Sequence, residues 1–98
     1  MVKYLVIFSK QAEKDKALLK AAGIDGKARE LIRVMAENPF AAPPRYEKLI
    51  GDLSGLYSRR INIQHRLVYE VIDTPIEKNG VKYKGMVRIL RMWTHYEK

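Results

Sequence analysis

Cysteine is absent from the 98-residue sequence, and its absence excludes several kinds of chemistry together. A chain without thiols forms no disulfide bond, builds no thiolate zinc site and offers no cysteine nucleophile. Thiols stay reduced in the cytoplasm, where proteins rarely depend on disulfides. We therefore expect a cytoplasmic protein, although a cysteine-free composition by itself fits other compartments.

Long hydrophobic runs are also missing from the sequence. No apolar segment approaches the roughly 20 residues that a membrane-spanning helix requires. The apolar start of the chain, residues 2–8, is short and continues into SKQAEKDK, which lacks the small-residue cleavage site of a signal peptide. The sequence thus predicts neither a membrane span nor a secretory signal.

Acidic side chains are few compared with basic ones. Asp and Glu total 11 against 19 Lys and Arg, which gives a formal net charge of +8. Such an excess on a small body creates a positive field that attracts polyanions. Nucleic acid is the first partner to consider, an acidic protein is the second, and both can bind the same protein. A basic surface that serves only solubility is the remaining interpretation.

The length predicts one domain over residues 1–98. Residues 2–8 (VKYLVIF) are strand-forming and show no clean alternation, which indicates a strand buried on both faces. Ser9 is a suitable N-cap for a basic helix over about 10–22, and Gly23 is a suitable residue to end it.

A second helix follows after a short connection. Asp25 is its candidate N-cap, and Asn38-Pro39 ends it, because proline disfavours the helical conformation in the residue before it. The short connection predicts that the two helices form an antiparallel hairpin. Apolar residues at helical spacing mark the face that packs on the rest of the protein: Ala28, Leu31, Ile32 and Met35.

The second half of the sequence has the pattern of a sheet. Residues 39–45 contain three prolines and predict an ordered loop. Asn79-Gly80 is a strong hairpin-turn dipeptide, because both central residues of a type I′ turn need positive φ, and it predicts a long β-arm over 74–85. The remaining strands are expected at 46–50, 56–63, 66–73 and 85–95.

The order β-α-α-β-β-β predicts an α+β fold. We expect a helical hairpin packed on one face of a mostly antiparallel, twisted sheet whose other face stays open. On a basic domain, an open sheet face is a surface where a polyanion can lie.

The sequence also contains the groups needed to cleave RNA without a metal or cofactor. Attack of a ribose 2′-hydroxyl on the adjacent phosphorus needs a base, an acid for the departing 5′-oxygen, and cations for the charge on the phosphoryl oxygens. A carboxylate, a histidine and planar arginines can supply these functions. The residues concerned are Glu47, Arg60, Arg66, His95 and Tyr96.

The arginines, the carboxylate and the internal histidine of this region each have an ordinary interpretation when taken alone. Arginines at 59, 60 and 66 are compatible with solvated positions on a sheet face, and Glu47 with a surface carboxylate. His65 is more typical of a hydrogen-bonded structural histidine than of a catalyst. Arg60 and Arg66 are six residues apart and would share a face of one straight strand. A bend near 62–65 would interrupt the alternation of side chains, so the spacing alone does not place them together.

The arrangement of these residues along the chain carries a more specific signal. LSGLYSRRI at 53–61, HRLVY at 65–69 and the terminal HY at 95–96 closely resemble the YoeB/Txe group of toxins in the RelE-like (RelE/ParE) toxin–antitoxin superfamily. The resemblance is dense over 46–73, clear at the C-terminus, and one of pattern more than identity in the N-terminal part. It implies a RelE-like fold.

The resemblance also implies a function and partners. Proteins of this group are toxins of type II toxin–antitoxin modules that act as ribosome-dependent endoribonucleases (mRNA interferases), cut mRNA in the decoding site and so inhibit translation. The implied partners are the 70S ribosome, mRNA and a cognate acidic antitoxin of the YefM/Axe kind. A homodimer is a further implication of the resemblance.

Site residues can be carried over from the group's motifs. Glu47 matches the general base, Arg66 the arginine that stabilises the phosphate and the transition state, and His95 the general acid. Tyr96 matches the tyrosine that orients substrate or stacks on a base, and Arg60 is similar to a supporting phosphate contact.

Three more residues are candidate substrate contacts: Arg59, His65 and Lys48. The roles of Arg59 and His65 stay open, and a structural or RNA-backbone role is expected for His65. Members of the group often carry Pro after the catalytic Glu and a Lys two positions further on. The run Glu47-Lys48-Leu49-Ile50 departs from that pattern, because Lys48 directly follows Glu47 and the group's lysine position is not matched.

Two alternative functions stay open from the sequence. A non-catalytic module that binds RNA or the ribosome and blocks translation by occupancy is supported equally well by charge. A superfamily member that poisons DNA gyrase is disfavoured by the presence of Glu47, Arg66 and the terminal His95-Tyr96. The arm over 74–85 is longer than the tight turn of many relatives, and its lysines suit either rRNA contacts or solubility.

Overall fold

The N-terminal part of the chain folds into a strand followed by two helices, as its apolar pattern predicts. The computed structural model describes residues 3–94, beginning with strand β1 (Tyr4–Phe8) and helix α1 (Lys10–Ala21). The Ser9 hydroxyl oxygen accepts the N–H of Ala12 at 3.0 Å, which confirms the predicted N-cap. Gly23 takes a positive φ of 75° just after α1 ends.

Helix α2 (Asp25–Glu37) begins one residue earlier than a cap at Asp25 would allow. Ile24 occupies the N-cap position, so the predicted capping role of Asp25 is wrong. The Asp25 carboxylate instead pairs with Arg29 one turn further along the helix. A carboxylate in the first turn still interacts favourably with the helix dipole, which explains why Asp suits this position without capping it.

Residues 3–94 form a main sheet with the strand order β1-β7-β4-β3-β2. Strand β1 runs parallel to β7, and the other neighbours are antiparallel, which confirms the mostly antiparallel prediction. The predicted strands are shortened where a 3₁₀ turn (Gly51–Leu53) and a turn over 61–65 interrupt them. The shortened strands are β2 (Tyr46–Lys48) and β3 (Leu56–Arg60), while β4 spans Arg66–Ile72 and β7 spans Gly85–Thr94.

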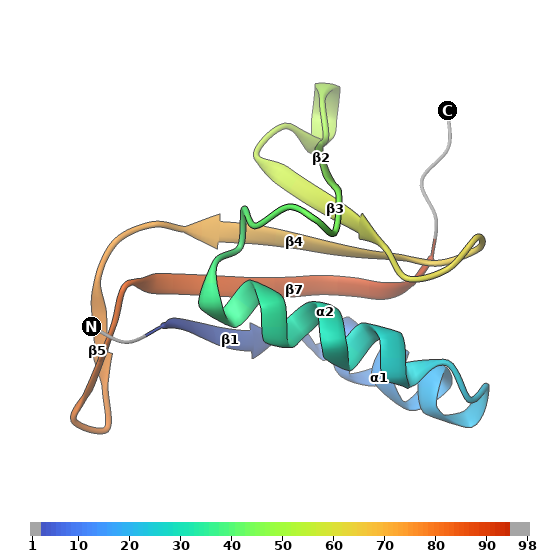
Figure 1. Ribbon diagram of the computed structural model, residues 1–98, viewed down its shortest axis with the longest axis horizontal. Helices are drawn as coiled ribbons and strands as arrows, with labels where there is room; N and C mark the ends of the chain where they lie inside the picture. The colour runs from blue at the N-terminus through green and yellow to red at the C-terminus, as the bar shows by residue number, and fades with distance from the viewer. Residues whose placement is uncertain (1–2, 95–98) are drawn as a thin grey trace.

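The Asn79-Gly80 turn joins two short strands that form a sheet of their own. Strands β5 (Ile76–Lys78) and β6 (Val81–Tyr83) pair antiparallel, and Asn79 and Gly80 have φ values of 52° and 80°. Both are positive, as a type I′ turn requires, so the predicted hairpin is confirmed. This arm extends from the end of the main sheet where Ile72 pairs with Met86 (Figure 1).

The two helices lie on one face of the main sheet and bury a core against it (Figure 1). Strand β1 is half-buried along its length, so the predicted burial on both faces is wrong; β1 is an edge strand that pairs with β7. Within the described residues no helix is long and apolar enough to cross a membrane. The core is built from Ala12, Leu19, Ala28, Leu31, Met35, Ile61, Leu67, Tyr69, Val87, Ile89 and Met92.

Candidate active site

The β3–β4 hairpin places two arginines side by side. Arg60, the last residue of β3, is the Cα partner of Arg66, the first residue of β4. The turn between them is closed by the Asn62 side-chain oxygen, which accepts the N–H of Gln64 at 2.8 Å and of His65 at 2.7 Å. A pair six residues apart therefore shares a face because the chain reverses, and not because one strand continues.

Strand β2 brings a carboxylate to the same face. Glu47 is the Cα partner of Ser58, and side chains of directly paired residues lie on one face of a sheet. Arg66 Nη1 lies 3.4 Å from Glu47 Oε1 and 3.3 Å from Ser58 Oγ. The Glu47 side chain is 45% exposed and that of Arg66 21%. These contacts are long, so the carboxylate and the guanidinium both keep capacity to bind another group.

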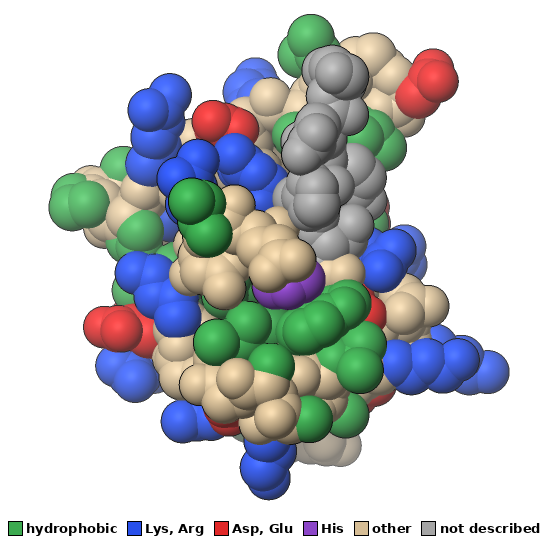
Figure 2. Space-filling model, turned by 90° about the vertical axis from the view of Figure 1, so that its right-hand side faces the viewer, with side chains coloured by type: hydrophobic (Ala, Val, Ile, Leu, Met, Phe, Trp, Pro, Cys, Tyr) green, Lys and Arg blue, Asp and Glu red, His purple; other side chains and the backbone are tan. Residues whose placement is uncertain are grey.

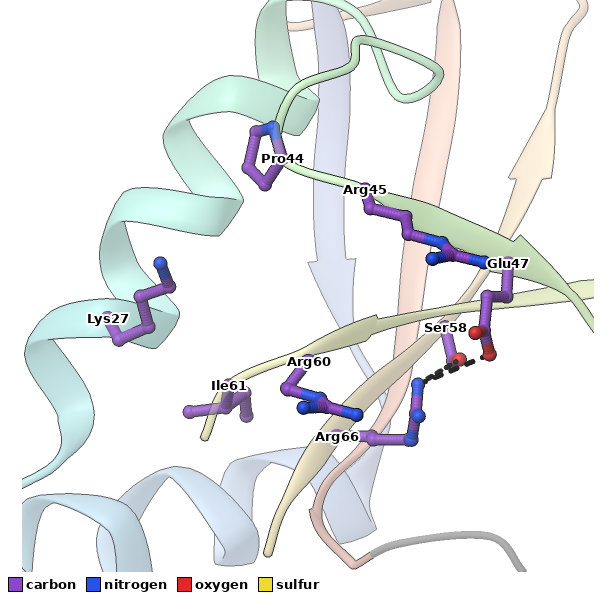
Figure 3. A pocket seen from close by; sticks show the side chains of 8 residues that line it. All are labelled: Lys27, Pro44, Arg45, Glu47, Ser58, Arg60, Ile61 and Arg66. Atoms are coloured by element: carbon purple, nitrogen blue, oxygen red, sulfur yellow. Dashed lines mark hydrogen bonds and ion pairs between the residues drawn. The ribbon is translucent and has the colours of Figure 1, made fainter. Parts of the chain in front are cut away.

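These side chains face an open cavity of about 430 Å³ between helix α2, the proline-rich loop and the β3–β4 hairpin (Figure 3). Figure 3 shows Lys27 on the helix side and Arg45 reaching from the loop toward Glu47. Four cationic side chains and one carboxylate line this space, which gives it a strong preference for anions. The lining residues are Lys27, Pro44, Arg45, Glu47, Ser58, Arg60, Ile61 and Arg66.

Three of these residues are not among those predicted from the sequence: Lys27, Arg45 and Ser58. Arg45 precedes Glu47 by two residues, so strand alternation could have placed it on the same face. Ser58 lies within the SRR motif and could have been found through its pairing with Glu47. No local pattern in the sequence marks Lys27 as a site residue, because its place beside the cavity depends on how α2 packs against the sheet.

Arg59 does not take part in this cavity. Its side chain is fully buried, and its guanidinium donates to the carbonyl oxygens of Pro44 at 2.6 Å and of Pro39 and Ala41 at 2.9 Å each. It also lies over the ring of Tyr46, 5.2 Å from the centroid. The predicted substrate contact of Arg59 is therefore wrong, since the group is committed to the 39–45 loop.

His65 and Lys48 are also placed away from the cavity. His65 is 6% exposed, and its ring stacks on Trp93 with centroids 4.1 Å apart. This contact supports the structural role predicted for His65 and not a contact with RNA. Lys48 is exposed, but it follows Glu47 in the strand and so projects from the opposite face of β2.

The two C-terminal site residues of the sequence prediction, His95 and Tyr96, lie outside the described residues. Thr94, the last described residue, is the Cα partner of Arg66. Among residues 3–94 there is no group of three or more His, Asp or Glu side chains that could hold a metal ion. In space-filling view, hydrophobic side chains gather at this end of the molecule, with Lys and Arg side chains to the left, to the right and below them (Figure 2).

Comparisons with known proteins agree on one family. Residues 8–96 match the family described as the YoeB-like toxin of bacterial type II toxin–antitoxin systems. The YoeB toxin of Synechocystis sp. is 43% identical over 61 residues, which are 62% of this chain and 64% of that protein. The YoeB toxin of Escherichia coli K12 is 43% identical over 71 residues, or 72% of this chain and 77% of that protein.

Solved structures give the same result for the fold. A YoeB/ParE toxin from Agrobacterium tumefaciens superposes with a TM-score of 0.74 at 28% identity, covering 94% of this chain and 99% of that one. YoeB from a YoeB–YefM complex of Staphylococcus aureus superposes with a TM-score of 0.70 at 30% identity, covering 95% and 98%. The α+β, RelE-like fold is thus confirmed, and the chain belongs to the YoeB-like toxins of bacterial type II toxin–antitoxin systems.

Proposed function

We propose that this toxin is a ribosome-dependent endoribonuclease that cleaves mRNA in the decoding site without a metal. The observation that carries the proposal is the convergence of Glu47, Arg60 and Arg66 on one cationic cavity. A basic module that only binds RNA needs no carboxylate in its phosphate site, where a negative charge opposes binding. A general base, in contrast, has to lie within reach of the phosphate-binding cations.

In this mechanism Glu47 removes the proton of the ribose 2′-hydroxyl. The freed oxygen forms a bond to the adjacent phosphorus, and the bond from phosphorus to the 5′-oxygen breaks. His95 gives its proton to that departing oxygen, which leaves a 2′,3′-cyclic phosphate and a 5′-hydroxyl. Arg66 and Arg60 stabilise the charge that develops on the phosphoryl oxygens, and Tyr96 stacks on a base to orient the substrate.

The loose geometry and exposure of the catalytic groups support a need for the ribosome. The Arg66–Glu47 contact of 3.4 Å is loose, and the carboxylate is nearly half exposed. Side-chain acids and bases without a metal depend on accurate substrate placement, and positioning contributes roughly 7–11 kcal/mol to lowering a barrier. The ribosome holds the mRNA codon in a fixed geometry and can supply that contribution.

An acidic antitoxin and a second copy of the toxin are the proposed protein partners. YoeB of Staphylococcus aureus has been solved both with YefM and as a dimer. The net charge of +8 favours a negatively charged chain that covers the basic surface, because charge complementarity speeds encounter. The proposed location is the cytoplasm, where translating ribosomes are present.

The test is to map the 5′ ends of cellular mRNA shortly after expression of the wild type and of Glu47→Gln, Arg66→Ala and His95→Ala. New ends inside codons are expected for the wild type, and none for the three variants. Lys48→Ala is the matched control, because Lys48 neighbours Glu47 but projects from the other face, and it should still cut. Growth arrest by the wild type without new ends would instead identify a translation blocker.

A further inference from the structure

Asp15 of helix α1 is a fully buried carboxylate that the proposed mechanism does not use. Its Oδ2 accepts the backbone N–H of Met92 at 2.8 Å, the N–H of Trp93 at 3.2 Å and the Nε–H of Arg91 at 3.0 Å. Its Oδ1 accepts an amide N–H of Gln11 at 3.1 Å. One helical side chain therefore binds three consecutive residues near the end of β7.

The sheet explains why β7 needs this partner. Within residues 3–94, β1 pairs with β7 as far as Phe8 and Ile89. The chain then turns into α1, and the Ser9 hydroxyl donates to the carbonyl oxygen of Leu90 at 2.9 Å. The next backbone N–H groups on this edge are satisfied by Asp15 instead of a strand. A buried N–H left without an acceptor destabilises the fold, so the carboxylate completes the sheet edge.

The opposite edge of the same segment borders the candidate active site. Strand β4 pairs with β7 so that Arg66 lies opposite Thr94, and the register shifts between Arg66 and Val68. The side chain of Trp93 stacks on His65, the residue that precedes Arg66. The end of β7 is therefore held between Asp15 on one side and the His65–Arg66 segment on the other.

We propose that Asp15 is a positioning residue for RNA cleavage, because it fixes the end of β7 relative to Arg66. The proposal rests on the proposed function, in which the general acid His95 directly follows Thr94 in the sequence. If the segment that leads to the acid is held less firmly, protonation of the departing oxygen should slow, whereas RNA binding should not change.

The charge of Asp15 is maintained by its contacts. Burial by itself raises the pKa of this carboxyl group, but the hydrogen bonds from Met92, Arg91 and Gln11 outweigh that effect and lower the pKa overall. The group is thus an anion at neutral pH, able to accept from all its donors. Asparagine has the same size but no charge, so its oxygen in the place of Oδ2 would bind the N–H groups of β7 more weakly, and its amide nitrogen would face the Gln11 amide N–H.

The test measures single-turnover cleavage of synthetic mRNA on programmed 70S ribosomes by the wild type, Asp15→Asn and His95→Ala. Each enzyme is given normal RNA and RNA with sulfur in place of the bridging 5′-oxygen at the cleavage point. Sulfur leaves as a thiolate and needs no proton, so this substrate removes the requirement for an acid. Glu13→Gln is the matched control, because it neutralises an exposed carboxylate of the same helix.

Asp15→Asn is expected to cut normal RNA about tenfold more slowly at unchanged ribosome affinity, and to recover most of this loss with the sulfur substrate. Equal slowing on both substrates, or no slowing, would overturn the proposal. His95→Ala reports on the proposed function separately, because failure of the sulfur substrate to restore its activity would reject His95 as the acid. If Asp15→Asn does not fold, Arg91→Met removes one donor to Asp15 and is judged by the same comparison.

Discussion

Arg59 of β3 and Tyr69 of β4 donate hydrogen bonds to the same atom, the carbonyl oxygen of Pro39, at 2.9 Å each. Both side chains are fully buried. Arg59 also binds the carbonyl oxygens of Ala41 and Pro44, and Pro44 lines the candidate active site. Two core side chains of the sheet thus determine the shape of the loop that forms one wall of the cavity.

Loss of the Arg59 guanidinium should destabilise the protein strongly. Arg59→Met removes three hydrogen bonds: the carbonyl oxygens of Ala41 and Pro44 lose this donor, and that of Pro39 keeps Tyr69 alone. Hydrogen bonds to a charged group contribute about 1.5–3 kcal/mol each, so the free energy of unfolding should fall by more than about 3 kcal/mol. Tyr69→Phe keeps the ring and removes one neutral hydrogen bond, for a loss of about 1 kcal/mol. Urea unfolding measures both. Equal losses would mean that the cost of burying the guanidinium cancels its hydrogen bonds.

The contrast between Arg59 and Arg60 shows where sequence reasoning reaches its limit. The helices, the sheet and the Asn79-Gly80 turn follow from local periodicity and turn chemistry, which the sequence contains. Adjacent arginines with identical chemistry differ only in the face of β3 on which they lie. That choice depends on pairing with β4 and on the loop carbonyls, which are distant in the chain.

Only part of the cavity could be predicted from the sequence, because some of its residues are brought together by packing between distant elements. Glu47, Arg60 and Arg66 could be grouped through a motif, and their convergence follows from antiparallel register. Lys27 reaches the cavity from a helix 20 residues before Glu47, so only the packing of α2 on the sheet reveals it. A local pattern contains no information about such a contact.

Asp15 should make the stability of the protein depend on acid. Because its pKa is lower in the folded state than in the unfolded chain, its contribution is fully present above the unfolded pKa of about 4 and is lost as pH falls through the folded pKa. The difference in unfolding free energy between the wild type and Asp15→Asn should therefore be large at pH 7 and shrink below about pH 4. The same comparison with Glu13→Gln should give a small difference at both pH values.

Lys27 and Arg45 should bind RNA phosphates beside the cleavage point. In a Glu47→Gln background that cannot cut, Lys27→Ala and Arg45→Ala should each weaken binding of a short single-stranded RNA and lower the slope of log K against log salt by about 0.7, the value for one phosphate contact. Fluorescence anisotropy over a salt series measures the slope. Lys82→Ala on the distant β5–β6 arm is the control and should leave it unchanged. An unchanged slope for Lys27 or Arg45 would remove that residue from the RNA path.

Gly85 should tolerate no side chain, because β1 and β4 both lie close to the chain where β7 begins. A Cβ there would meet the carbonyl oxygen of Ile72 and ring carbons of Tyr4 at 3.0 and 3.2 Å. The Tyr4 ring can turn away, but the Ile72 oxygen belongs to the β4 backbone and cannot move without disturbing the β4–β7 register. Gly85→Ala should therefore destabilise the fold by about 1–3 kcal/mol.

Gly26 in α2 has open space around it, and Gly26→Ala should stabilise by about 0.5–1 kcal/mol through helix propensity. Thermal unfolding distinguishes the two, and a Gly85→Ala protein as stable as the wild type would show that the strand ends can separate freely.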